Sequence, residues 1–433
     1  MSMDVADVLA HADEQAPVWL KEHRNSVRDV WTASALPTRK TELWKYTNTR
    51  ALQQTYLAAP KVVADIQPSL DAVPAIGALR LVFVNGYFSA EHSDSELPEG
   101  LECVRFADAN DQQAGFISAR LGSALPKHSH PFLPLNQTGM NDGLLVNVAP
   151  HARLEKPIQV VWLTAGASAP FAVQPRVLVA LGDCAQATLI EHFADSAAQA
   201  SFTNAVTELL LEGGSSLDYY RLNFESGHAL HVGGVHAMLG RDASLSSFCL
   251  GLGADMKRID LVANMAQPGA HAQLDGIYLP RGHEHIDYHT VLEHAAPHCT
   301  SMETFRGVIA DRSRAVFNGR IHIHPNAQKT SAELSNKNLL TSNEAEINTK
   351  PELEIYADDV KCAHGATVAQ LNDMAVHYLM SRGISKAEAE VMLSFGFVNE
   401  VLESTRLTEL REALRPLLAE RFARDPALLR HLT

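Results

Sequence analysis

Hydrophobic and polar positions repeat with a regular period in the middle of the chain, from Gly213 to Ala366. Turn-forming residues recur about every 14 positions, and short strand-like runs lie between them, as at 217–222, 245–250, 258–262 and 320–324. Two such units of one strand and one turn would complete a coil. Because no helix-length segment separates the strands, the pattern predicts stacked coils rather than βαβ units. We therefore expect a mainly β fold, a right-handed parallel β-helix (a solenoid). A β-sandwich with regular turn spacing is the alternative.

The chain before the repeats indicates a different organisation. Apolar residues at helical spacing predict helices up to about residue 57, and three prolines mark residues 58–78 as a linker. The run 81–84 followed by Asn85-Gly86 predicts a strand entering a hairpin. Strand-and-turn character resumes at Gly143. These boundaries predict an N-terminal helical domain and linker over 1–78 and a β-helix core over 79–366.

After the repeats the spacing becomes helical, which predicts a C-terminal helical domain over 367–433. Two segments fit a capping box, Thr367–Gln370 and Ser385–Glu388. Three helices are expected, with these apolar faces in turn: Val368, Leu371, Ala375 and Tyr378; Val391, Phe395, Val398 and Leu402; Leu407, Leu410, Leu414 and Leu417. This domain would cover an open edge of the solenoid or dock a partner.

Composition narrows the class of protein. The chain is 46% apolar and 20% charged, with a formal charge of −14, which argues against unspecific nucleic-acid binding. Its five dispersed cysteines include no CxxC pair, and its first residues lack an export signal. No apolar run is long enough for a membrane span. We therefore expect a reduced, cytoplasmic protein that binds neither nucleic acid nor membrane. No phosphate-binding or dinucleotide-binding glycine motif is found.

Cys362 and His364 stand two positions apart where the repeats meet the C-terminal helices. In a strand, side chains alternate between faces, so these two would share a face. A thiolate and an imidazole can bind a metal, but two ligands do not complete an iron–sulfur or zinc site. The other ligands would have to come from elsewhere in the chain or from another chain. The alternative is a buried cysteine beside an exposed histidine.

A second candidate is the histidine-rich run His283-Glu-His285-Ile-Asp287-Tyr-His289, whose alternate residues would form a metal ladder on one strand face. A row of polar side chains on a wet face is the alternative, and it is favoured more strongly for the similar run Arg320-Ile-His-Ile-His324. The aromatic and basic segment 37–47 is best explained by packing, with Trp44 and Tyr46 capping one end of the following sheet.

Several of these blocks together resemble the SufB/SufD family of the SUF iron–sulfur cluster assembly machinery. The blocks are Pro37-Thr-Arg-Lys-x-Glu-x-Trp-Lys-Tyr-Thr47, Leu135-Asn-x-x-x-x-x-Asp-Gly143, Val316-Phe-Asn-Gly-Arg320, Asp359-Val-Lys-Cys-Ala-His-Gly-Ala-Thr367 and Gly396-Phe. The resemblance extends over nearly the whole chain, and the block around Cys362 and His364 is the most specific. The chain is similar to SufD-type rather than SufB-type members, because it has no N-terminal cysteine cluster.

The resemblance implies a β-helix flanked by helical domains and an assembly subunit without catalytic activity of its own. Its partners would be a SufB-type subunit, paired through the β-helix, and a SufC-type ABC ATPase, docked on the C-terminal helices that carry Val391, Phe395, Val398 and Leu402. His364 would face a SufB cysteine at a nascent iron–sulfur cluster, with Cys362 beside it. ATP hydrolysis would open the shared site. A reduced flavin is associated with such complexes, but no residue here locates it.

The alternative function is a stand-alone metalloenzyme on a β-helix that uses His283, His285 and His289. A carbohydrate-acting β-helix enzyme is a weaker alternative, because aromatic residues make up 6% of the chain and no acidic pair stands out. Whether the isolated chain pairs with itself is left open by the sequence, although the end of a solenoid invites such pairing.

Overall fold

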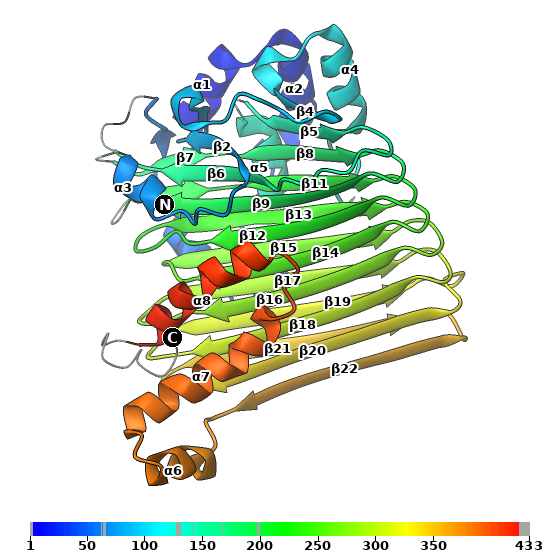
Figure 1. Ribbon diagram of the computed structural model, residues 1–433. Helices are drawn as coiled ribbons and strands as arrows, with labels where there is room; N and C mark the ends of the chain where they lie inside the picture. Colours follow the sequence, from blue (N-terminus) through cyan, green and yellow to red (C-terminus); the bar gives the residue numbers. More distant parts are fainter. Residues whose placement is uncertain are drawn as a thin grey trace.

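In the computed structural model the strands wind into a solenoid with two long sheets (Figure 1). The structure describes residues 3–423 except 62, 64, 65, 127–130, 141, 168 and 197–199. The twelve-stranded sheet contains β4 (Leu101–Arg105), β5 (Leu144–Val148), β8 (Arg176–Leu181), β11 (Val206–Leu211), β13 (Leu230–Leu239), β15 (Met256–Met265), β17 (His285–His294), β19 (Arg314–Ile323) and β21 (Glu346–Ile355), with β1 (Leu57–Ala58), β7 (Phe171–Val173) and β10 (Ser201–Thr203) beside them. The ten-stranded sheet contains β2 (Leu79–Val84), β3 (Tyr87–Phe88), β6 (Ile158–Thr164), β9 (Gln186–Asp195), β12 (Ser216–Asn223), β14 (Ser244–Leu252), β16 (His271–Leu279), β18 (Thr300–Ile309), β20 (Thr330–Leu340) and β22 (Val360–Ala369).

The chain passes from one sheet to the other and returns one coil further on, so successive coils pair in parallel. This arrangement confirms the predicted parallel β-helix. The coil length is less regular than the sequence period suggests. Leu230 pairs with Met256 in the middle of the solenoid, whereas Arg314 pairs with Glu346 near its end, so the later coil is the longer of the two. The register between strands stays regular because the extra residues of the longer coil lie in its turns.

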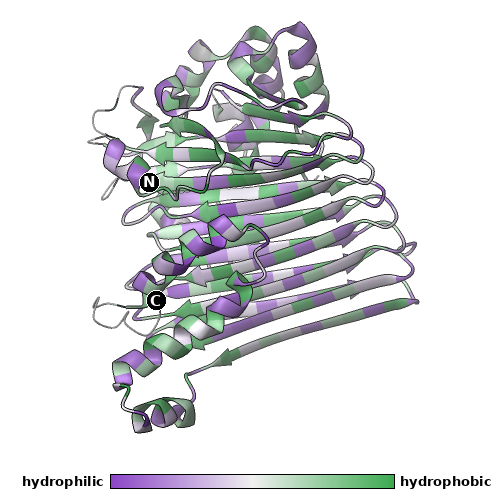
Figure 2. Cartoon of the chain, viewed as in Figure 1, coloured by the Kyte–Doolittle hydropathy of each residue, from purple (hydrophilic) through white to green (hydrophobic). Residues whose placement is uncertain are grey.

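The solenoid is filled by side chains that point inward from both sheets. On β20, Ala332 and Leu334 are buried in this core, whereas the alternate residues Ser331 and Glu333 are exposed. Figure 2 shows hydrophobic and hydrophilic residues following each other along the strands. On β12, by contrast, neighbouring residues face two different cores: Tyr219 points inward, and Tyr220 lies in a second cluster under the C-terminal helices. Strands covered on both faces therefore lack the simple alternation.

Helical segments cover opposite sheets. On the side of the twelve-stranded sheet lie α1 (Ala6–Gln15), α2 (Val18–Thr32), α4 (Asp111–Arg120), α5 (Phe132–Gly139) and the 3-10 turns η1 (Glu42–Trp44), η2 (Thr49–Leu52) and η4 (Phe106–Asp108). A short helix, α3 (Gln67–Asp71), and η3 (Ala90–His92) lie beside the first strands of the ten-stranded sheet. The C-terminal helices α6 (Asp373–Ser381), α7 (Lys386–Leu402) and α8 (Thr408–Phe422) follow β22, and α7 and α8 pack on the ten-stranded sheet (Figure 1).

Two local predictions at turns and caps are confirmed. Asn85 and Gly86 have positive φ values of 53° and 82° and join β2 to β3 as an antiparallel hairpin. The capping box at Ser385 and Glu388 starts α7, with hydrogen bonds in both directions. Because such turns and caps depend on residues close in sequence, they can be recognised without the tertiary structure.

The capping box expected at residues 367–370 is wrong. The strand β22 continues to Ala369, and the side chain of Asn372 caps α6 instead. Pairing with β20 keeps Thr367 and Val368 extended, which outweighs their local helical signal. Helices α4 and α5 lie before Gly143, within the segment assigned to the β-helix core. Residues 424–433 of the predicted C-terminal domain lie outside the described residues.

Candidate functional site

The solenoid is open at the end formed by β21 and β22, which we call the open rim. Within the described residues, β21 pairs only with β19, and β22 pairs only with β20. Four apolar side chains of the last coil pack against the core without being fully covered: Ile347, Leu353, Val360 and Cys362. The rim therefore presents unpaired strand edges together with the exposed end of the hydrophobic core, a combination that favours association with another chain.

Cys362 and His364 lie on the inner side of this rim. Cys362 pairs in register with Ala332, and His364 pairs with Leu334, both of which point into the core. Since residues in register share a face, Cys362 and His364 continue the inward-facing rows of β20, as the alternation of side chains predicts. Cys362 is part-buried and His364 is exposed, because no further coil covers them. Burial raises the pKa of the Cys362 thiol, and only a hydrogen bond from Ala332 opposes this effect.

The segment 37–47 packs against the outer face of the twelve-stranded sheet, as expected for Trp44. The indole is 1% exposed, and the guanidinium of Arg258 lies 4.2 Å from its ring centroid. Arg258 also donates to the carbonyl oxygen of Leu43 and pairs with Asp287 at 3.2 Å. Tyr46 differs, because it is 45% exposed and lines a pocket between this segment and the sheet. The segment 37–47 thus attaches the N-terminal region to the solenoid.

The histidine ladder at 283–289 is not assembled as the sequence suggested. His283 lies in the turn before β17 and shares no strand face with His285 and His289. His285 hydrogen-bonds to Thr47 at 2.9 Å, and burial lowers the pKa of its imidazole. His289 lies 3.1 Å from Asp287. Although burial alone would raise the pKa of Asp287, the charges of His289 and Arg258 lower it to about 2. His285 and Asp287 thus help to attach the segment 37–47 to the sheet.

The four apolar residues assigned to partner docking are covered by the solenoid. Val391, Phe395, Val398 and Leu402 are all at most 9% exposed, and the last three form a core with the ten-stranded sheet. They hold α7 on the solenoid, so their side chains are not available to an ATPase in this structure. On the described helices of this domain, the large apolar residues that remain exposed belong to α6 and include Met374 at 77% and Tyr378 at 57%.

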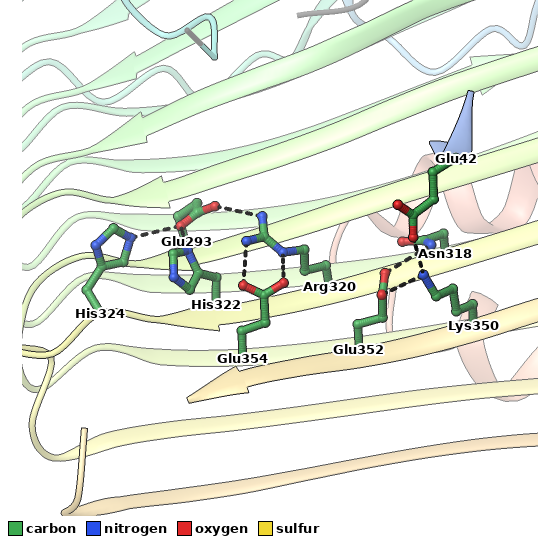
Figure 3. Close-up of polar contacts among 9 residues, drawn as sticks. All are labelled: Glu42, Glu293, Asn318, Arg320, His322, His324, Lys350, Glu352 and Glu354. Carbon is green, nitrogen blue, oxygen red and sulfur yellow. Dashed lines mark hydrogen bonds and ion pairs between the residues drawn. The ribbon is translucent and has the colours of Figure 1, made fainter. Parts of the chain in front are cut away.

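One cluster of possible metal ligands is not predicted by the sequence. Glu293 of β17 meets His322 of β19 and His324 just beyond it (Figure 3). Among the described residues, this is the group of three or more histidine, cysteine or acidic side chains whose ligand atoms lie within 4.8 Å of one another. The sequence does show the alternating histidines, but Glu293 belongs to the preceding coil and reaches His322 only through strand pairing.

The fold and the rim together define a parallel β-solenoid protein whose last coil offers a thiol and an imidazole beside unpaired strand edges. Among the described residues, no helix combines the length and apolar character needed to cross a membrane. Residues 163–397 match the family described as "SUF system FeS cluster assembly, SufBD core domain", and residues 7–160 match "SufBD protein N-terminal region".

Similar proteins support the assignment to the SufBD family. The chain is 31% identical over 392 residues to the iron–sulfur cluster assembly protein SufD of Escherichia coli, with 90% of each chain covered. It is 30% identical over 407 residues to an iron–sulfur cluster assembly SufBD family protein of Synechocystis sp., with 92% of this chain and 90% of the relative covered. It is 25% identical over 422 residues to SufD of Bacillus subtilis, with 92% of this chain and 93% of the relative covered. The chain belongs to the SufB/SufD family of iron–sulfur cluster assembly proteins of the SUF system, and its relatives include SufD proteins, as the sequence blocks predicted.

Proposed function

We propose that this protein is the SufD-like subunit of a SufBCD-type complex and contributes half of a nascent iron–sulfur cluster site. The observation that carries the proposal is the position of Cys362 and His364 on the inner side of the open rim. A thiolate and an imidazole are accepted ligands of iron, but two of them leave the coordination incomplete. A second β-solenoid that pairs with β21 and β22 would cover this side and supply the missing thiolates.

In this proposal the partner is a SufB-type subunit, and the cluster is a cargo that forms and leaves. The chain itself acts as a non-catalytic scaffold, and a reduced flavin belongs to the complex without an assigned residue in this chain. The same unpaired edges would allow the isolated chain to form a homodimer. Movement of the two solenoids, driven by ATP hydrolysis in a SufC-type ATPase, would expose the shared site.

The site is tested by replacing His364 with alanine in the reconstituted complex. Because a metal ligand is lost, cluster formation should fall roughly tenfold or more, while the complex still elutes as one species. Cluster formation is followed by visible absorption and circular dichroism, and complex formation by size-exclusion chromatography. The matched control is Lys361→Ala, since Lys361 is exposed on the opposite face of the same strand. Equal rates of cluster formation for His364→Ala and wild type would refute the assignment.

The docking surface for the ATPase is proposed to be the exposed face of α6 rather than the buried face of α7. Met374 and Tyr378 present apolar side chains to solvent at one end of the C-terminal domain. Replacing both with glutamate should weaken binding of the SufC-type subunit roughly tenfold or more, because charges would replace apolar contact area. Lys386→Glu on α7 is the control, as this side chain is 70% exposed. The affinities are compared by calorimetry, and unchanged binding of the α6 variant would place the ATPase elsewhere.

A further inference from the structure

Glu293, His322 and His324 form a compact cluster on the outer face of the twelve-stranded sheet, away from Cys362 and His364, which belong to the other sheet. One oxygen of Glu293, Oε2, lies 2.6 Å from Nδ1 of His322 and 2.9 Å from Nε2 of His324. The planes of the two imidazole rings are tilted by 37° to each other, and their centroids are 4.4 Å apart. Two ring nitrogens and one carboxylate oxygen therefore converge on a single point.

The backbone holds these groups in place. Glu293 and His322 are direct partners in the pairing of β17 with β19, so their side chains leave the sheet side by side. The neighbouring residues Ile321 and Ile323 are fully buried in the core, which fixes the outward direction of His322. His324 follows at the end of β19 and bends back towards the same carboxylate. All three side chains are part-buried, with exposed fractions of 19% for His322, 23% for Glu293 and 40% for His324.

Further contacts orient the carboxylate. Arg320 lies 3.3 Å from Oε1 of Glu293, the oxygen that faces away from the histidines. Two hydrogen bonds of 2.8 Å tie the same guanidinium to Glu354 (Figure 3). The ring of Tyr356 meets His322 edge-on, with centroids 5.6 Å apart. Oε2 is thus presented to the histidines, while the charge of Arg320 is balanced by Glu354. Supporting contacts of this kind are usual around the ligands of metal sites.

We propose that Glu293, His322 and His324 form a binding site for a divalent first-row transition-metal ion. Two imidazoles and one carboxylate suit ions such as Fe²⁺, Co²⁺ and Zn²⁺ rather than Mg²⁺ or Ca²⁺, which prefer oxygen ligands alone. Ligand atoms about 2.0–2.1 Å from a tetrahedral ion are about 3.3 Å from each other. The observed separations of 2.6 and 2.9 Å from the carboxylate would therefore need to widen by less than about 1 Å.

Both imidazoles lie within hydrogen-bond distance of one carboxylate oxygen, and a bound ion would replace these hydrogen bonds. Three protein ligands leave at least one coordination position for water, which makes the bound ion exchangeable. The inference does not depend on the proposed shared cluster site, since it uses other residues on another sheet.

The test is a cobalt titration of the full chain, without a purification tag, treated with chelator and kept reduced. The chain carries Cys362→Ser and His364→Ala, so that the open rim cannot contribute ligands. One equivalent of Co²⁺ should produce visible d–d absorption, and Zn²⁺ should abolish it. His322→Ala and Glu293→Gln should each weaken cobalt binding roughly tenfold or more. His228→Ala is the matched control, because this exposed histidine pairs with a single carboxylate, that of Asp255 at 3.0 Å.

Absence of d–d absorption, or equal cobalt affinity in the Glu293→Gln and His322→Ala variants, would overturn the inference. Thermal unfolding of each variant shows whether the fold is kept, which is expected because the replaced side chains are part-buried and lie outside the core. Failure of this site would leave the proposed role of the open rim untouched, since that role is decided by cluster formation in the His364→Ala complex.

Discussion

Replacing Arg176 with methionine is expected to lower the free energy of unfolding by about 3–5 kcal/mol, because it leaves a buried carboxylate without its counter-charge. Arg176 and Glu208 are both fully buried and form an ion pair between β8 and β11. Glu208 also accepts hydrogen bonds from the backbone N–H groups of Gly122 and Ala124, at 2.8 and 3.1 Å. These contacts join the segment after α4 to the sheet, so the loss should affect the whole N-terminal half.

The hydrogen bonds around Arg176 also explain the sequence block 135–143, one of those that resemble the SufB/SufD family. Arg176 donates to Oδ1 of Asn136 at 3.0 Å, and the amide of Asn136 donates to the carbonyl oxygens of Pro175 and Asn204. The asparagine in the 135–143 block is therefore a structural residue that connects α5 to the loops between strands. It is too far from the open rim in the order of the strands to contribute to the proposed cluster site.

Urea unfolding of the Arg176→Met variant measures this effect, and a surface ion pair provides the control. Arg312 lies 3.0 Å from Glu344, and both side chains are largely exposed. Arg312→Met should cost less than about 1 kcal/mol, because water screens that pair. Adding Glu208→Leu to Arg176→Met should recover part of the lost free energy. If the single Arg176 variant were as stable as the Arg312 variant, the buried pair would have no structural importance.

Replacing Glu303 with glutamine is expected to stabilise the protein increasingly as the pH rises from about 4.5 to about 8. Glu303 points into the solenoid from β18 and is flanked in register by Leu274 and Leu334. Burial among these apolar neighbours raises the pKa of the Glu303 carboxyl from 4.5 to about 8. Between about pH 4.5 and about pH 8, the folded protein therefore keeps a proton on Glu303 that the unfolded chain has already released.

The direction of the effect follows from proton linkage. Between the two pKa values the unfolded state binds fewer protons than the folded state, so stability falls as the pH rises, by up to about 1.4 kcal/mol per pH unit. Above the folded pKa both states have lost the proton, and the decline ends. Glutamine has no such proton, so Glu303→Gln should exceed wild type by a few kcal/mol near pH 8 and by much less near pH 5.

Urea unfolding at several pH values checks this expectation. The control is Glu333→Gln, since Glu333 is exposed on the outward face of the next strand, β20. This substitution should change the pH dependence much less than Glu303→Gln. A constant difference in unfolding free energy between Glu303→Gln and wild type, across the whole range, would contradict the prediction.

The sequence by itself determined the class of fold and several of its parts. The periodic turns predicted a parallel solenoid because each coil repeats the same local requirement: a short strand followed by residues that permit a turn. The hairpin at Asn85-Gly86 and the capping box at Ser385 were also readable, since their stabilising contacts join neighbours in sequence. Strand alternation placed Cys362 and His364 on one face.

Only the tertiary structure decided which side chains meet. Pairing with β20 kept residues 367–369 in a strand despite a local capping signal, and the sheet buried the face of α7 that includes Phe395 and Leu402. Glu293 reaches His322 because the coil between them brings the two residues into register. A solenoid carries its local pattern in the sequence, whereas contacts between coils depend on exact coil length. That length differs from one coil to another in this chain, so the sequence period alone could not predict them.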